Sequence, residues 1–253
     1  MDMTRRLLLV LAVLGVLASI APAPGVATAT PATSAPVVHL SHPDGVAAGA
    51  KASSSGALYR FQSLLAGKPI RWNPCTPIHW RFRAPGAPAG ALPMVKKAVA
   101  RVAKATGTTW VYDGAMWSAP TTAWLPTSTK NIRPVLIGWT DAAHSDLLKG
   151  QPKAVLGVTR TAWFSTTRDG KQVAAIRAAV IALDQTDRLP LTGSVSWYGV
   201  TLHELAHAMG LDHAANSRQL LYPILQRGLT DLQSGDLQGL AKVGRQAGCV
   251  TVP

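Results

Sequence analysis

The sequence predicts an α/β domain, and three features of the chain favour this fold class. Residues 78–82 alternate apolar and polar side chains, as a half-buried strand does. A helix is expected over 92–105, where apolar residues recur every three or four positions before Gly107. Residues 173–183 are apolar on every side, and we predict a buried strand there because a turn-like Arg-Asp-Gly sequence precedes them.

The remaining elements are shorter strands and two further helices. An amphipathic helix is expected over 195–210, capped by Ser194 or Ser196, and a C-terminal helix over 234–245. We expect the shorter strands over 108–112, 134–139 and 154–159.

Composition bounds the size of the domain and the classes of partner. The chain has 253 residues, 47% of them hydrophobic, which is enough for one sizeable core. Its net charge of +13 favours anionic surfaces. The basic residues are scattered without a basic run, so we expect no nucleic-acid partner. We expect a monomer, and the abundance of Ala, Arg and Gly is typical of a GC-rich bacterial source.

The N-terminus has the pattern of an export signal. Arg5 and Arg6 precede an apolar run over 7–20, and an Ala-Thr-Ala cleavage sequence follows at 27–29. A membrane anchor is the alternative, but the apolar run is shorter than the roughly 20 residues that a spanning helix needs. We therefore predict a signal peptide over 1–29 and a secreted, extracellular protein.

The next segment differs in composition from the rest of the chain. Residues 30–68 are rich in Ala, Pro, Ser, Gly and Thr and have little periodicity. We interpret them as a disordered linker or a short pro-segment. A single folded domain is then expected over 69–253.

Residues 203–213 fit the pattern H-E-x-x-H-x-x-G-x-x-H at every specified position. His203 and His207 are four positions apart, so they lie on one helix face and reach one zinc ion. Gly210 tolerates positive φ, which lets the chain turn and bring His213 to the same ion. Three protein ligands leave a fourth position for water, the pattern of a catalytic zinc site.

Glu204 is the only glutamate of the chain, and it stands inside this motif. Its neighbours are the predicted ligands, so its carboxylate is expected beside the metal. Zinc acidifies a bound water to a pKa of about 7, and Glu204 would act as the general base that takes the proton. The predicted activity is hydrolysis of peptide bonds in protein or peptide substrates.

The chain has two cysteines, Cys75 and Cys249. In an oxidising compartment we expect them to form a disulfide. The alternative is a latency thiol, in which one cysteine caps the zinc before activation.

The motif resembles that of the metzincin clan of zinc peptidases, and the turn over 219–223 is similar to that of the matrixin family. This resemblance covers about residues 70–250 and implies a zincin fold, with a twisted mixed sheet of about five strands, an active-site helix and a C-terminal helix. On the same analogy, 154–159 is the antiparallel edge strand that pairs with substrate. The strand over 173–183 would precede the active-site helix.

The resemblance has departures. The clan has a methionine in the turn below the zinc, and this chain has Leu221 at the matching position. Leucine is also apolar, so we expect the surface below the metal to stay apolar. A second zinc and calcium ions are usual in matrixins. Asp141, His144 and Asp146 hint at that zinc, but further histidines are missing, and few carboxylates remain for calcium. We predict a pocket for an apolar substrate residue, formed by Leu220, Leu221, Tyr222 and Pro223.

Two alternatives to a general endopeptidase remain open. The first is an inactive metzincin-like module that binds an anionic cell envelope, suggested by the missing methionine and the basic charge. The second is a zinc hydrolase of cell-wall peptides, which would use the same machinery on another substrate.

Overall fold

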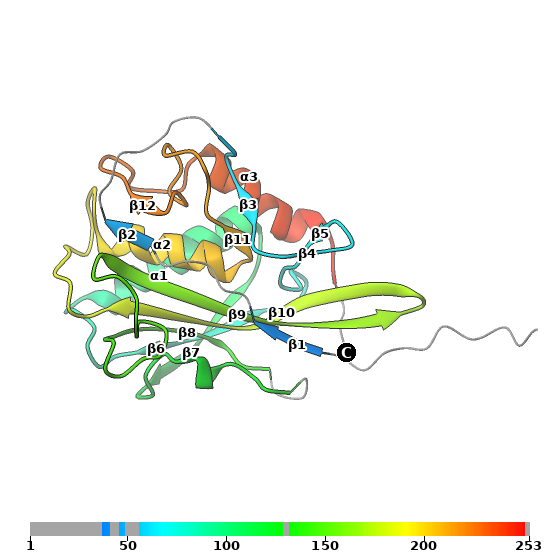
Figure 1. The fold of residues 1–253 in the computed structure, drawn as a ribbon, viewed down its shortest axis with the longest axis horizontal. Coiled ribbons are helices and arrows are strands. Elements are labelled where there is room, and N and C mark those ends of the chain that lie inside the picture. Colours follow the sequence, from blue (N-terminus) through cyan, green and yellow to red (C-terminus); the bar gives the residue numbers. More distant parts are fainter. Residues whose placement is uncertain (1–36, 41–45, 49–55, 129–131, 251–253) are drawn as a thin grey trace, which may run out of the picture. The chain divides into compact units, whose positions relative to one another are not determined.

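A computed structural model describes residues 37–40, 46–48, 56–128 and 132–250 (Figure 1). The predicted signal peptide, residues 1–29, lies outside the described residues. Among the residues that the structure does describe, every helix is too short or too polar to cross a membrane.

The described residues form one eight-stranded sheet, and four of its five longest strands run parallel to one another. The fifth, β9, pairs antiparallel with β10 and closes one side of these five strands. This arrangement confirms the predicted mixed α/β fold with an antiparallel edge strand. In spatial order the strands are β7 (Trp110–Met116), β6 (Ile78–Arg83), β8 (Val135–Thr140), β10 (Lys171–Asp184) and β9 (Val155–Arg168).

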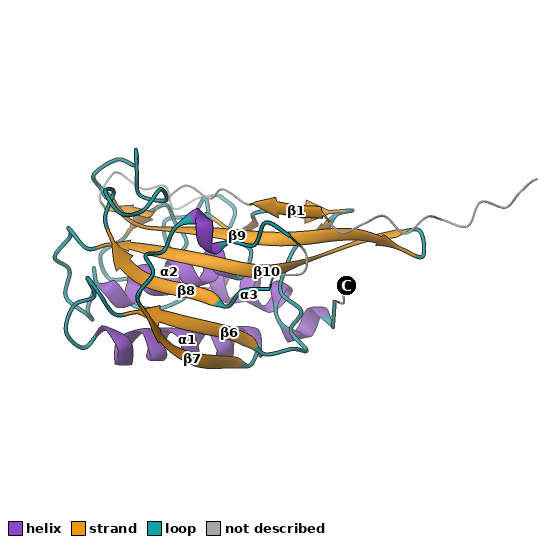
Figure 2. Ribbon diagram, turned by 90° about the horizontal axis from the view of Figure 1, so that it is seen from below, coloured by secondary structure: helices purple, strands orange, loops and turns teal. Residues whose placement is uncertain are grey.

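In the described residues three α-helices lie on one side of this sheet (Figures 1 and 2). They are α1 (Ala91–Thr106), α2 (Trp197–Ala208) and α3 (Ser234–Val243), with short 3-10 turns η1 (Thr122–Trp124) and η2 (Arg245–Ala247). Helices α1 and α2 contact the strands of the sheet, and α3 packs against α1. Helix α1 ends at Gly107 with φ 67°, as its sequence predicts. The larger core lies between the helices and the sheet, and a smaller one on the opposite face includes Leu136, Leu147 and Val158.

The predicted disulfide between Cys75 and Cys249 is present, with Cα atoms 5.5 Å apart. It joins the segment before β6 to the segment after η2. By the loop-entropy estimate, closing so long a loop stabilises the fold by up to about 5 kcal/mol. The described residues contain no free cysteine, so a latency thiol is excluded in this structure.

Short strands from the N-terminal segment line the outer side of β9. Strands β1 (Val37–Leu40) and β2 (Val46–Ala48) both pair antiparallel with β9. On its other side β2 pairs in parallel with β12 (Ile224–Leu225). The other short strands are β3 (Arg60–Phe61), which pairs with β11 (Leu211–Asp212), and β4 (Leu64–Leu65), which pairs with β5 (Lys68–Pro69).

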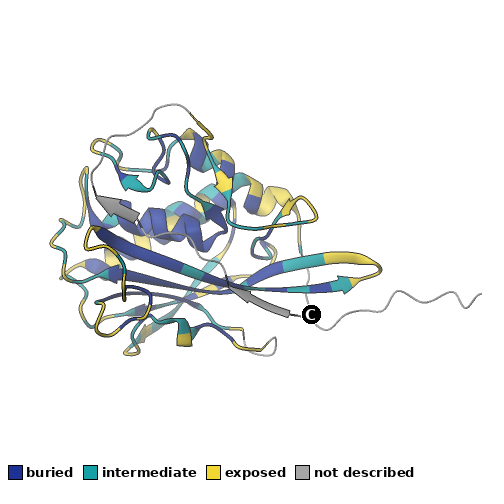
Figure 3. Ribbon diagram, in the orientation of Figure 1, coloured by how far each residue is buried: buried dark blue, intermediate teal, exposed yellow. Residues whose placement is uncertain are grey.

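Two elements differ from the sequence prediction. Strand β9 continues to Arg168 instead of ending at 159, because it pairs with β10 in a long hairpin that extends beyond the other strands (Figure 1). Helix α2 was expected to be amphipathic, but eleven of its twelve residues are buried (Figure 3). It lies between the sheet and the segment that follows it, so no broad polar face reaches water.

Candidate metal centre and active site

Helix α2 carries the first part of the motif in the interior of the protein. Its N-terminus is capped by Ser196, whose Oγ accepts a hydrogen bond from the Gly199 amide at 3.4 Å. Ser194, the other predicted cap, instead accepts from the amide of Gly228. The side chains of His203, Glu204 and His207 follow on α2 and are fully buried.

A sharp turn after α2 brings the third histidine back to the helix. Gly210 has φ 102°, a conformation that side chains strongly disfavour. A Cβ atom at this position would also lie 2.6 Å from the carbonyl oxygen of Ile70. Both facts require glycine here, as the sequence predicts. The chain then forms β11 and places His213 against the histidines of α2.

The three histidines form a group that fits one zinc ion. The Nδ1 atoms of His203 and His207 lie 2.8 Å from the carbonyl oxygens of Leu220 and Leu211. A carbonyl oxygen only accepts, so each Nδ1 carries the proton and each Nε2 keeps its lone pair. His213 Nε2 is buried, and none of the residues that the structure describes forms a hydrogen bond with it. Ligand atoms of the three rings lie within 4.8 Å of one another, and no other such group occurs in the described parts of the chain.

Burial keeps these histidines neutral. It lowers the pKa of His207 to about 3 and that of His213 to about 4, and it lowers the pKa of His203 well below its ordinary value. The neighbouring imidazoles act in the same direction on His203 and His207. Neutral imidazole is the form that binds zinc. Zinc binding near neutral pH would therefore not have to displace a proton from these histidines.

Glu204 lies in the same buried region. Burial raises the pKa of its carboxyl to about 8, although a hydrogen bond from Thr159 opposes the shift. Thr159 Oγ1 donates to Glu204 Oε2 at 2.6 Å, and Glu204 Oε1 has no hydrogen-bond partner among the described residues. The carboxylate thus has one oxygen held by β9 and one oxygen available for chemistry.

The shifted pKa of Glu204 predicts how the stability of zinc-free protein depends on pH. Between pH 4.5 and 8 the Glu204 carboxyl is protonated in the folded state and ionised in the unfolded state. The proton therefore stabilises the folded state at low pH, and this stabilisation decreases with rising pH until it is lost at about pH 8. Glu204→Gln removes the effect. The free energy of unfolding of the variant minus that of wild type should therefore increase by about 2 kcal/mol as pH rises from 6.5 to 8.

Denaturant unfolding of both zinc-free proteins at several pH values measures this difference. The three histidines contribute equally to the pH dependence of both proteins, so their contribution cancels in the difference. Their lowered pKa values give the opposite trend, a loss of stability as pH falls below 6.5. A difference that stays constant from pH 6.5 to 8 would show that the Glu204 pKa is unshifted.

The segment below the histidines comprises the predicted pocket residues. Leu220 and Leu221 are buried in the main core, with Leu221 0% exposed, whereas Tyr222 and Pro223 are half-buried just before β12. Asp236 at the start of α3 accepts hydrogen bonds from the amides of Leu220 at 2.8 Å and Leu221 at 3.2 Å. Because Leu220 O accepts from His203, Asp236 supports the orientation of the His203 ring through this turn.

Three polar residues singled out in the sequence lie elsewhere. Asp141 and His144 are hydrogen-bonded to each other at 2.6 Å, and Asp146 accepts from the amide of Thr122 at 2.9 Å. These contacts fit a loop of polar side chains.

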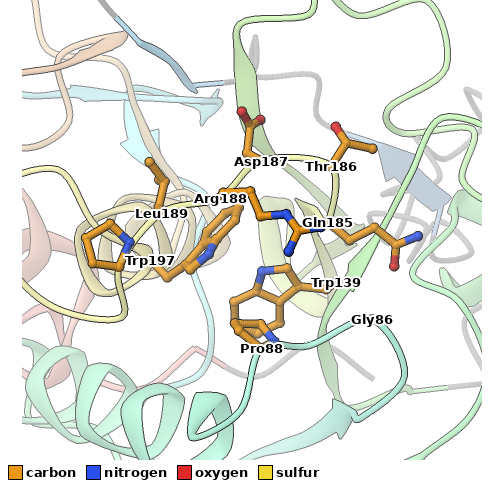
Figure 4. Close-up of a pocket in the computed structure, with 10 residues that line it drawn as sticks. Gly86, Pro88, Trp139, Gln185, Thr186, Asp187, Arg188, Leu189 and Trp197 are labelled. Atoms are coloured by element: carbon orange, nitrogen blue, oxygen red, sulfur yellow. The ribbon is translucent and has the colours of Figure 1, made fainter.

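A pocket of about 870 Å³ opens at the carboxyl ends of β8 and β10. Trp139, Asp187, Arg188 and Trp197 are among the residues that line it (Figure 4). The Trp139 and Trp197 rings meet edge to face, with centroids 5.4 Å apart. None of the three histidines lines this pocket, and neither does Glu204, so it is separate from the metal centre.

Sequence reasoning found the three histidines and Glu204 but missed the residues that support them. Thr159 and Asp236 come from β9 and α3, far from the motif in sequence. No local pattern marks Thr159. For Asp236 the one signal is its position as the third residue of α3, in a capping box with Gln233.

Comparisons with known proteins agree with this site. A family model described as Matrixin matches residues 104–243, more than half of the chain, including α2 and the turn to α3. The chain is also similar to Metalloendoproteinase 2-MMP of Arabidopsis thaliana, with 29% identity over 109 residues. That match covers 42% of this chain and 28% of the relative, so most of the relative's length is unmatched.

Proposed function

Because this chain belongs to the matrixin family, we propose that it is a zinc-dependent endopeptidase in which Glu204 acts as general base. The observation that carries the proposal is the convergence of three neutral histidines, two of them fully buried and the third partly buried, beside a buried glutamate. His203, His207 and His213 would hold one zinc ion. A bound zinc supplies Lewis-acid activation of water and of the peptide carbonyl.

The chain's own residues then handle the proton. The positive charge of a bound cation favours the ionised form of Glu204, which is the form that accepts a proton. Glu204 takes the proton of the attacking water and returns it to the leaving amine. Burial of the carboxylate strengthens these interactions because competing water is excluded.

An extended peptide would bind along β9. Strand addition satisfies peptide backbone groups against a sheet edge, and neighbouring pockets then select side chains. The turn comprising Leu220, Leu221, Tyr222 and Pro223 is the proposed wall of the pocket for the residue after the scissile bond. In the structure Tyr222 and Pro223 offer the accessible part of that wall.

Hydrolysis of casein and of cell-wall peptides, read by mass spectrometry, tests this function. An endopeptidase should cut casein internally, with apolar residues favoured after the cleaved bond. Cleavage of cell-wall peptides but not of casein would identify the protein as a hydrolase of cell-wall peptides. Zinc-loaded protein that cuts neither, yet binds anionic envelope fragments, would replace the endopeptidase with a binding module.

We further propose that the protein is secreted from a bacterial cell. The pattern of residues 1–29 and the disulfide between Cys75 and Cys249 support this compartment. N-terminal sequencing of protein from the culture medium should find a chain that starts near residue 30. Protein retained in the cells with residues 1–29 attached would contradict it.

For residues 30–68 we favour the pro-segment over the linker. Val46 in β2 is paired with Gly157 of β9, and a Cβ atom at Gly157 would lie 3.0 Å from Glu204 Cγ. Strand β2 therefore runs alongside β9, next to the proposed general base, and lies between β9 and β12. A substrate strand would need the same edge of β9, so the pairing supports an inhibitory role.

Ala47→Pro in the full chain tests this role. Proline lacks an amide hydrogen and fits poorly in a strand with partners on both sides, so β2 should leave β9. The value of kcat/KM for a peptide substrate should rise severalfold. Ala50→Pro, two residues beyond the end of β2, is the matched control. Equal activity of both variants and wild type would leave residues 30–68 as a linker.

A further inference from the structure

Strand β9 contacts the Glu204 carboxylate through two residues on the same face. Thr159 Oγ1 lies 2.6 Å from Glu204 Oε2 and 3.1 Å from the Glu204 main-chain oxygen. Gly157, two positions earlier, leaves no room for a side chain, since a Cβ there would lie 3.0 Å from Glu204 Cγ and 3.1 Å from Oε1. Thr159 is 1% exposed and Glu204 0%, so bulk water does not compete for this contact.

The two carboxylate oxygens therefore have different surroundings. A threonine hydroxyl donates one hydrogen, and here the shorter of its two contacts is with Oε2. Oε1 is buried and has no hydrogen-bond partner in the part of the chain that the structure describes. Hydrogen bonds to an ionised group are among the stronger ones in proteins, and this bond restricts rotation of the carboxylate.

We propose that Thr159 is the positioning residue for Glu204, holding Oε2 so that Oε1 faces the proton that the reaction transfers. The inference rests on the proposed function, because it assigns Thr159 a part in that same hydrolysis. A general base must lie within hydrogen-bond reach of its proton, and a small misplacement of such a group costs about 100-fold in rate.

Kinetics of three variants separate positioning from a structural role. Thr159→Val keeps the shape of the side chain and removes the hydroxyl, so kcat should fall about 10- to 100-fold with KM and zinc content unchanged. Thr159→Ser keeps the hydroxyl and should restore most of kcat. Thr140→Val removes a buried hydroxyl in β8, a strand that does not pair with β9, and should behave like wild type.

A spectroscopic measurement tests the contact independently of activity. Glu204 is the only glutamate, so protein made by cell-free synthesis with ¹³C at the glutamate δ carbon gives one carboxyl resonance. The Thr159→Val substitution should shift this resonance, whereas Thr159→Ser and Thr140→Val should leave it near its wild-type position. The spectra can be recorded on zinc-loaded protein without any substrate.

The two readouts distinguish the inference from the proposed function. Wild type that hydrolyses no peptide would refute the function and with it the role of Thr159, even if the resonance shifts. Active wild type with an unchanged kcat in Thr159→Val would overturn the positioning role alone. So would a fall in kcat that Thr159→Ser fails to restore, or an equal fall in Thr140→Val.

Discussion

Glu204→Gln is expected to lower kcat/KM for peptide hydrolysis by about 10²- to 10⁴-fold while the protein keeps its zinc. Glutamine has nearly the shape of glutamate but cannot take a proton. The ligands are the three histidines, which the substitution does not touch, so the metal site should stay intact. Initial rates and elemental analysis of the same samples measure the two quantities together.

The matched control is Asp169→Asn, which makes the same change from acid to amide at the exposed tip of the β9–β10 hairpin. It should have wild-type kcat/KM. If Glu204→Gln binds one zinc and keeps more than a tenth of wild-type activity, another group is the base. If the variant loses its zinc, Glu204 supports the metal site itself, and the assigned role is wrong.

Gly210→Ala is expected to weaken zinc binding about 10- to 100-fold, comparable to losing a group that orients a ligand. Alanine at φ 102° is strained, and its Cβ would approach the Ile70 carbonyl oxygen to 2.6 Å. The backbone must move to relieve this contact. His213 follows three residues later, so the movement should displace it from the other two histidines.

Gly114→Ala is the matched control, because it introduces the same backbone strain at a site where it should not displace His213. Gly114 also has positive φ, 92°, but no described residue comes within 4 Å of a Cβ atom placed there. It belongs to β7, at the opposite side of the five long strands from β9. Competition with a chromophoric chelator gives the zinc affinity of each variant. Gly114→Ala should bind zinc as wild type does. Equal affinity of Gly210→Ala and wild type would show that the turn does not determine the place of His213.

Short-range patterns explain why so much of the site could be predicted. The spacing of His203 and His207 fixes their helix face, and the need for positive φ at Gly210 is a local property of the backbone. The apolar run that became β10 and the helix pattern of α1 are local in the same sense. These signals suffice to predict the group of three histidines, the glutamate beside it and the order of the main elements.

The rest depends on contacts between distant segments. Thr159 reaches Glu204 across 45 positions, and nothing in the residues around Thr159 marks it as a partner. The second half of β9 mixes polar and apolar residues, and its strand structure comes from pairing with β10. The burial of α2 on nearly all sides likewise follows from packing, because periodicity alone does not report which faces are covered.

The central claim is that one zinc ion on the three histidines, with Glu204, hydrolyses peptide bonds. Zinc titration of chelator-treated protein tests it most directly, with casein hydrolysis measured at each addition. We predict no hydrolysis by metal-free protein and a linear return of activity that ends at one zinc per chain. Full activity without metal, or one bound zinc with no hydrolysis of any peptide, would contradict the claim.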